Sequence, residues 1–151
     1  MTSVRTSRDY PGRIAEAEEL WYDLDRWAAF IDGFHHIDKR EGDWPHADAV
    51  VLWQSFPGGR GRVLERVTSY TPREGQTLEV EDEKLLGTRR VKFAALEDGV
   101  RIELSLDYEL KERNVLTRLT DVFFIRRAMR DSLRRELARF GSELQAEREF
   151  R

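Results

Sequence analysis

The sequence contains no cysteine, which excludes disulfide bonds, thiolate catalysis and cysteine-ligated zinc. It also has no long hydrophobic run: no window approaches the roughly 18 apolar residues of a membrane span. The N-terminal stretch MTSVRTSRDYPGR lacks the apolar core of a signal peptide. We therefore expect a protein without a membrane span, located in the cytoplasm.

A strong excess of one charge is missing as well. Charged residues make up 36% of the 151 residues, yet the formal net charge is only −3. Overall attraction to nucleic acid or to an anionic membrane is therefore not expected. The length suits a single domain spanning residues 1–151, and no internal repeat or low-complexity tract divides it.

The period of the hydrophobic pattern changes along the chain, from helix to strand and back to helix. Residues 5–14 suit a first strand, and Pro11 and Gly12, which interrupt it, indicate either an edge position or a bulge. Residues 16–34 repeat apolar side chains every three or four positions, which predicts a helical pair that ends at Gly33. Alternating segments joined by short turns then predict an antiparallel meander, in which Asp98-Gly99 is the strongest hairpin signal. These strands are expected at residues 35–43, 49–56, 60–70, 76–84, 87–96 and 99–110.

A long C-terminal helix follows the strands. Its apolar stripe keeps helical spacing through Met129, Leu133, Leu137, Phe140 and Leu144. This helix is the main element left to cover the apolar face of the sheet. The fold class is therefore α+β, a sheet of about six to seven antiparallel strands with one long helix.

Four stretches carry a resemblance to a known superfamily: IAEAEELWYDLDRWAAFIDGF, GRGRVLERVTSYTP, EDGVRIELSLDYEL and FFIRRAMRDSLRRELARF. Together they resemble the START/Bet v 1-like helix-grip (SRPBCC) superfamily, and within it the polyketide cyclase/dehydrase and lipid transport group. The resemblance implies a curved sheet wrapped around the long helix, with two short helices after the first strand. It also implies a hydrophobic cavity for lipids, hormones, polyketides or other apolar molecules. The YPG sequence at the end of the first strand departs from the family pattern.

The apolar face of residues 99–110 belongs either to a packed core or to such a cavity. On the helix, about 100° per residue places Arg126 on the centre line of the apolar stripe. Either the helix begins or bends near 122–126 and Arg126 reaches solvent, or Arg126 enters a partly wet cavity with Glu65 as its partner. The candidate ligand-binding residues are Trp53, Glu65, Phe93, Leu104, Leu106, Tyr108, Phe123 and Arg126.

Two functions compete for that cavity. The first is binding of an apolar small molecule. The second, implied by the resemblance, is a cyclase, aromatase or dehydratase reaction that uses Tyr108, Arg126 or Glu65 as acid–base or oxyanion-stabilising groups. No catalytic residue follows from the pattern itself, since the serines have no elbow motif.

Neither a metal site nor a cofactor is expected. His35 and His36 are neighbours in a predicted strand, so their rings should point to opposite faces. The glycines near residue 60 precede a strand and lack the lysine of a phosphate loop.

The last helix is rich in arginine between residues 126 and 139. We interpret this stretch as a solvated helix face. The alternative is an interaction domain that uses this basic face, although no aromatic strand motif for nucleic acid accompanies it. The apolar segment VFFI at residues 122–125 could support a homodimer contact.

Overall fold

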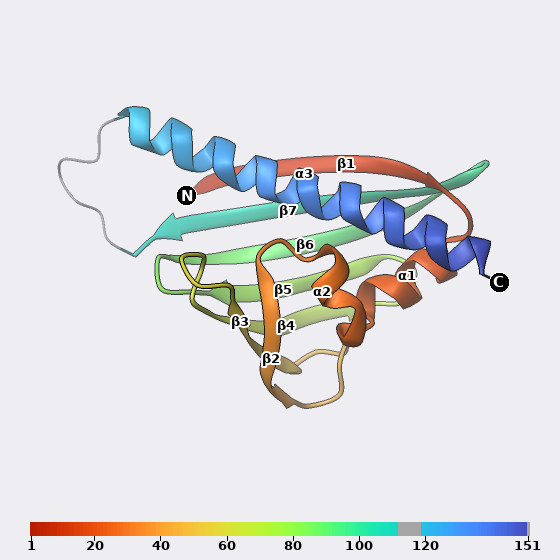
Figure 1. Cartoon of the computed structure of the whole chain (residues 1–151), viewed down its shortest axis with the longest axis horizontal. Coiled ribbons are helices and arrows are strands. Elements are labelled where there is room, and N and C mark those ends of the chain that lie inside the picture. The colour runs from red at the N-terminus through yellow and green to blue at the C-terminus, as the bar shows by residue number, and fades with distance from the viewer. Residues whose placement is uncertain (112–118, 151) are drawn as a thin grey trace.

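The structure, a computed structural model, describes residues 1–111 and 119–150, without the side chains of 119–121. The helices within these residues lie on one side of one sheet (Figure 1). The elements in chain order are β1 (Thr2–Pro11), α1 (Ile14–Tyr22), the 3-10 helix η1 (Leu24–Arg26), α2 (Trp27–Phe30), β2 (Phe34–Glu41), β3 (Val50–Ser55), β4 (Arg62–Thr71), β5 (Gly75–Glu81), β6 (Leu85–Leu96), β7 (Gly99–Leu110) and α3 (Leu119–Glu149).

Within the described residues the sheet has seven strands in the order β1-β7-β6-β5-β4-β3-β2, and every neighbouring pair is antiparallel. The meander from β2 to β7 follows the chain, and β1 joins it beside β7. The predicted α+β fold with its long C-terminal helix is therefore confirmed. The two edges of the sheet are β1 and β2.

The first strand is shifted relative to its prediction. It spans Thr2–Pro11 instead of 5–14, and only Val4 and Tyr10 are buried in it. With so few apolar side chains it shows little alternation, so its extent follows from ten paired positions along β7. The expected edge position is confirmed, with Pro11 as the last residue of the strand.

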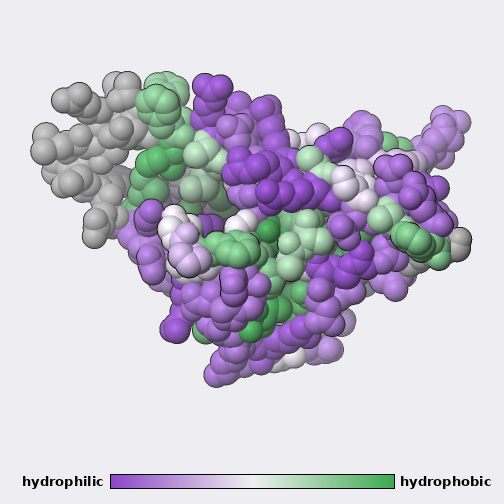
Figure 2. Space-filling view, in the orientation of Figure 1, coloured by the Kyte–Doolittle hydropathy of each residue, from purple (hydrophilic) through white to green (hydrophobic). Residues whose placement is uncertain are grey.

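Alternation places one face of each central strand under the helices. In β7, Ile102 and Leu104 are completely buried and Tyr108 nearly so, whereas Arg101 and Glu109 on the opposite face are exposed. The strand therefore has the dry and the wet face that its sequence predicts. Around the helices, hydrophobic residues reach the surface between α3 and the elements below it, bordered by hydrophilic ones (Figure 2).

The hairpin between β6 and β7 forms, but its turn lies one residue earlier than the Asp98-Gly99 signal indicates. Leu96 pairs with Gly99, so Glu97 and Asp98 make the turn. Gly99 already belongs to β7, where a Cβ atom would lie 2.1 Å from the carbonyl oxygen of Tyr10. The glycine is required by the close approach of β1.

The C-terminal half of α3 closes the core. Leu133, Leu137, Phe140 and Leu144 are buried, and the Phe140 ring makes edge contacts with three aromatic rings. These rings are Tyr10, Trp21 and Phe30, with centroids 5.6, 5.3 and 5.2 Å away. The Tyr10 hydroxyl also donates to the Leu137 carbonyl at 2.7 Å. Helix α3, α1, α2 and β1 thus share one aromatic cluster.

The predicted helical pair is also confirmed, with a break at Asp23. The Asp23 carboxylate accepts a hydrogen bond from the Asp25 amide at 3.1 Å and starts η1 between α1 and α2. Tyr22, the last residue of α1, is buried against the rings of Tyr70 and Phe93. Its hydroxyl has no hydrogen-bond partner among the described residues.

This unpartnered hydroxyl leads to a prediction for Tyr22→Phe. A buried hydroxyl without a partner loses its hydration and gains nothing in return, so its removal should raise the free energy of unfolding by about 1 kcal/mol. Burial also raises the pKa of Tyr22, so the folded state resists the ionisation that the unfolded chain undergoes near pH 10. Urea unfolding at pH 7 and pH 10.5 measures both effects. The advantage of the variant should grow at the higher pH, and a less stable variant would contradict the prediction.

Candidate functional site

The covered face of the sheet brings together six of the eight predicted site residues. All six are buried, and they come from β3, β4, β6 and β7. Most are apolar, but Glu65 contributes a carboxylate to the interior. The six are Trp53, Glu65, Phe93, Leu104, Leu106 and Tyr108.

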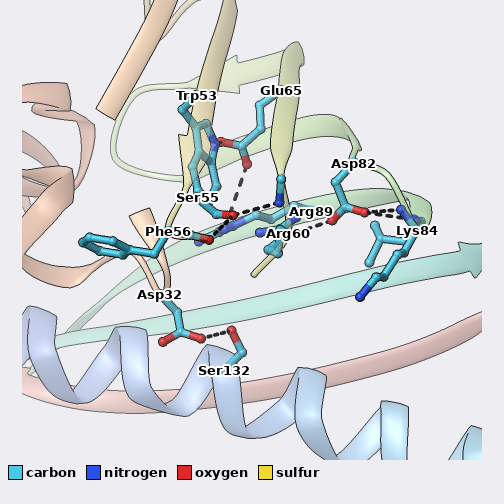
Figure 3. Close-up of polar contacts among 12 residues, drawn as sticks. Asp32, Trp53, Ser55, Phe56, Arg60, Glu65, Asp82, Lys84, Arg89 and Ser132 are labelled. Carbon is cyan, nitrogen blue, oxygen red and sulfur yellow. Dashed lines mark hydrogen bonds and ion pairs between the residues drawn. The ribbon is translucent and has the colours of Figure 1, made fainter. Parts of the chain in front are cut away.

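A buried ionic network occupies the middle of this face. Arg89 of β6 lies between two carboxylates, with its Nη2 atom 2.5 Å from Glu136 of α3 and its Nη1 atom 3.9 Å from Glu65 of β4. Glu65, Glu136 and Arg89 are only 2%, 1% and 7% exposed. Trp53 Nε1 donates to the other Glu65 oxygen at 3.0 Å. Figure 3 shows Trp53 and Glu65 directed toward each other above Arg89.

The charged groups of this network shift the pKa values of Arg89 and Glu136. Burial alone would lower the pKa of Arg89, but Glu136 and Glu65 outweigh it and raise this pKa, so the guanidinium stays protonated. Burial raises the pKa of Glu136 above its usual range, although Arg89 opposes the shift. Two carboxylates share one close guanidinium here.

Arg60 provides a second cation at the border of the network. It lies over the Trp53 ring, 5.4 Å from the centroid, and its Nε donates to Asp82 at 2.9 Å. Asp82 in turn accepts hydrogen bonds from the amides of Lys84 and Leu85 and so fixes the turn between β5 and β6 (Figure 3). Because the Arg60 side chain is 28% exposed, it connects the buried network with the surface.

Asp32 fastens the α2–β2 turn to α3 next to the network. Its carboxylate accepts a hydrogen bond from the Ser132 hydroxyl at 2.7 Å (Figure 3). It also accepts hydrogen bonds from Arg135 and Arg139 at 2.9 to 3.2 Å. Its backbone amide donates to Glu136 at 3.3 Å. Burial opposes ionisation, yet the bonds from Arg135 and Ser132 lower the pKa of Asp32.

We predict that Asp32→Asn lowers the free energy of unfolding at pH 7 by about 1 kcal/mol, since the arginine partners are half exposed and screened by water. A carboxylate whose pKa is lowered by folding stabilises the fold above its unfolded pKa near 4 and loses this effect as the pH falls. The difference in free energy of unfolding between wild type and variant should therefore become smaller below pH 4. Urea unfolding at pH 7 and pH 3.5 measures it, and a gap that is constant with pH would contradict the assignment.

The other two predicted residues lie at the N-terminal part of α3. Arg126 is exposed, and its Nε donates to the Ser3 carbonyl of β1 at 3.3 Å. The predicted Arg126–Glu65 pair does not form, because Glu65 faces Arg89. Helix α3 is continuous from Leu119, so Arg126 reaches the surface along the edge of β1 and not through a late helix start. Phe123 is 69% exposed.

Arg89 and Glu136 were not among the predicted site residues, although the sequence contains a signal for each. Phe93 is a predicted site residue, and Arg89, four residues earlier in the same strand, has the same parity. Glu136 lies three residues after Leu133 and four before Phe140, so it falls within the apolar stripe of α3. A charged residue at an inward position is the sign to look for.

The histidines differ from their prediction. The Nδ1 atoms of His35 and His36 lie 2.6 Å apart, so the rings do not point to opposite faces. A register shift between Phe34 and His36 bulges β2 at this point and turns both rings to one side. Among the described residues no group of three or more histidine, aspartate or glutamate side chains is arranged to hold a metal ion.

These features define a helix-grip protein: an antiparallel sheet holds a long C-terminal helix against its inner face, two short helices follow the first strand, and a few polar groups lie in the apolar interior. The chain belongs to the polyketide cyclase / dehydrase and lipid transport family, whose model matches residues 1–145. The predicted superfamily is thereby confirmed.

Solved structures show the same fold at low sequence identity. A protein from Thermus thermophilus is 19% identical, with a TM-score of 0.77, over 96% of this chain and 98% of that one. Ara h 8.0201 is 12% identical, with a TM-score of 0.74, over 96% and 98%. Norcoclaurine synthase from Thalictrum flavum is 9% identical, with a TM-score of 0.70, over 95% and 92%. No curated protein matches the sequence, and no described helix is both long and apolar enough to cross a membrane.

Proposed function

We propose that the protein binds an apolar small molecule between the inner face of the sheet and α3. One observation carries this proposal: α3 packs tightly only from Leu133 onward, whereas residues 122–132 of the helix include no fully buried side chain. This part of α3 lies toward the end of β7 that bears Leu106 and Tyr108 (Figure 1). A ligand bound between this part of α3 and the end of β7 would contact apolar side chains.

The buried network supports recognition of a polar group on that ligand. Ligand sites are mostly apolar with a few polar groups that fix orientation. A network of buried charges is no better for stability than apolar residues of similar volume. Arg89 and Glu136 therefore suit a carbonyl or hydroxyl of the ligand better than they suit packing. Trp53, Phe93 and Leu104 would provide the apolar walls, and Tyr108 a further hydroxyl.

Fluorescence titration with the uncharged apolar dye N-phenyl-1-naphthylamine tests the proposal. Leu106→Trp enlarges a side chain on the inner face and should weaken dye binding at least about tenfold, which corresponds to 1.4 kcal/mol. Leu86→Trp is the matched control, because Leu86 is 47% exposed on the outer face of the sheet. Absence of dye binding, or equal weakening in both variants, would refute the proposal. Native mass spectrometry of the purified protein and of Arg126→Ala would show whether a molecule co-purifies and whether Arg126 contributes.

A cyclase or dehydratase reaction in the same place is the second candidate. The raised pKa of the Glu136 carboxyl favours it, because a carboxyl that keeps its proton beside a guanidinium can act as a general acid. Incubation with a poly-β-ketoacyl thioester and analysis of the products tests this reaction. Glu136→Gln should abolish product formation and leave dye binding intact. Product formation that survives in Glu136→Gln would exclude this role.

A further inference from the structure

The N-terminal part of α3 exposes large apolar side chains. Phe123 and Phe124 are each 69% exposed, and Val122 before them is 41% exposed. Figure 2 shows hydrophobic residues at this end of α3, followed along the helix by hydrophilic ones. Contiguous exposed apolar side chains, unlike single scattered ones, indicate an interaction surface.

Arginines follow these rings on the same side of the helix. At about 100° per residue, Phe123, Arg127, Arg130 and Arg134 fall within an arc of about 60°, and Phe124 flanks it. Arg127 and Arg130 have no carboxylate partner among the described residues, and Arg134 has only a 4.0 Å contact with Asp131. Arg135 and Arg139, in contrast, are bound to Asp32. These five arginines thus form two sets, and Asp32 neutralises only the second.

A basic groove extends the first set across the outer face of β1, β7 and β6. It has a volume of about 580 Å³. Its two acidic residues already have partners, since Glu103 pairs with Arg5 at 3.7 Å and Asp107 with Arg90 at 3.0 Å. The excess of positive charge is therefore local, in a protein whose net charge is −3. The basic side chains of the groove are Arg5, Arg90, Lys92, Arg126, Arg130 and Arg134.

We propose that this surface, formed by Phe123, Phe124, Arg127, Arg130, Arg134 and the adjoining groove, docks on an anionic phospholipid bilayer. The phenyl rings enter the boundary between headgroups and acyl chains, and the guanidinium groups contact lipid phosphates. The apolar tip, Phe123 and Phe124, is followed along α3 by arginines. This order matches a bilayer surface, where the acyl chains lie beneath the anionic headgroups. A nucleic acid would match the charge but would leave the projecting tip without a role, and an acidic protein would need an apolar pocket for it.

Docking of this kind goes beyond ligand binding and does not depend on it. Dye binding is measured without vesicles, and vesicle binding is measured without an interior ligand, so each proposal can fail alone. Docking would place residues 122–132 of α3 against the lipid. An apolar molecule could then pass between the bilayer and the protein at this segment.

Sedimentation with extruded vesicles tests the docking proposal, using phosphatidylcholine alone and with about 30 mol% phosphatidylserine. Wild type should sediment with the anionic vesicles and much less with the neutral ones, and added salt should weaken the binding. Phe123→Ser/Phe124→Ser and Arg127→Glu/Arg130→Glu should each reduce binding at least about tenfold. Lys39→Glu/Arg62→Glu is the matched control, since it makes the same charge change with exposed residues of β2 and β4 and should bind like wild type.

Any of several results would overturn the proposal. One is the absence of vesicle binding in the wild type, with circular dichroism showing a folded protein. Another is an equal loss of binding in the Lys39/Arg62 control, which would indicate a response to net charge alone. A third is dimerisation in analytical ultracentrifugation that the Phe123/Phe124 variant abolishes while vesicle binding is absent, which would assign the surface to a second copy of the chain. Tight binding of single-stranded RNA without vesicle binding would likewise assign it to nucleic acid.

Discussion

Arg89→Met should be strongly destabilising, by about 3–5 kcal/mol in free energy of unfolding, although methionine fills much of the same space. The substitution leaves Glu65 and Glu136 in the interior without their shared cation, and both carboxylates are at most 2% exposed. Urea unfolding followed by circular dichroism measures the loss. Arg101→Met is the matched control, because Arg101 also binds a carboxylate, that of Asp9, but on the exposed outer face. It should cost less than about 1 kcal/mol.

The pH dependence separates charge from shape in this experiment. Without Arg89 to oppose it, burial raises the pKa of Glu136 further, so the folded variant binds more protons than the unfolded chain and becomes more stable as the pH falls. The difference from wild type should therefore narrow between pH 7 and pH 5. The triple variant Arg89→Met/Glu65→Gln/Glu136→Gln removes all three charges and should recover most of the loss. A triple variant as unstable as Arg89→Met would mean that the arginine acts by packing.

Phe140→Ala should be strongly destabilising in the apolar part of the core, by about 3–5 kcal/mol in free energy of unfolding. Phe140 is completely buried and contacts the rings of Tyr10, Trp21 and Phe30, so its removal leaves a cavity at the contact of α3 with α1, α2 and β1. For a protein of this length the midpoint of thermal unfolding should fall by roughly 10 °C. Phe150→Ala is the control at the exposed end of α3, where the side chain is 90% exposed, and it should change stability by less than about 0.5 kcal/mol. Equal effects at both positions would contradict this account of the core.

Periodicity was sufficient to predict most of the fold. The alternation in β7 and the spacing of Leu133, Leu137 and Phe140 depend on local geometry alone, so one sequence reveals them. Strand β1 is different, because its backbone pairing with β7 defines it more than its own side chains do. The predicted start of β7 at residue 99 is confirmed, but the Asp98-Gly99 signal lies one residue after the turn that Glu97 and Asp98 make, for a related reason. Gly99 is a glycine because the β1 backbone passes close to it, which is a long-range contact.

The site was predictable only as a set of inward positions. Parity places Arg89 and Glu65 on the covered face, but their meeting depends on strand order and register across β4, β5 and β6. Glu136 joins them from a helix that begins after all seven strands. The Arg126–Glu65 pair was a reasonable prediction from the helical stripe. It is wrong because the N-terminal part of α3 follows β1. At Arg126 the stripe therefore faces the edge strand and not the middle of the sheet.

The contact of Arg126 with Ser3 also affects how this protein can meet copies of itself. A sheet edge offers unpaired backbone groups to any passing strand, and strand addition at such edges leads to aggregation. At β1 the guanidinium of Arg126 occupies one of these carbonyls, and α3 runs along the strand. At the opposite edge, β2 carries register shifts and the charged side chains of Lys39, Arg40 and Glu41. Each edge is thus protected against the addition of a further strand in a different way, β1 by α3 and Arg126 and β2 by its irregular register and charged side chains.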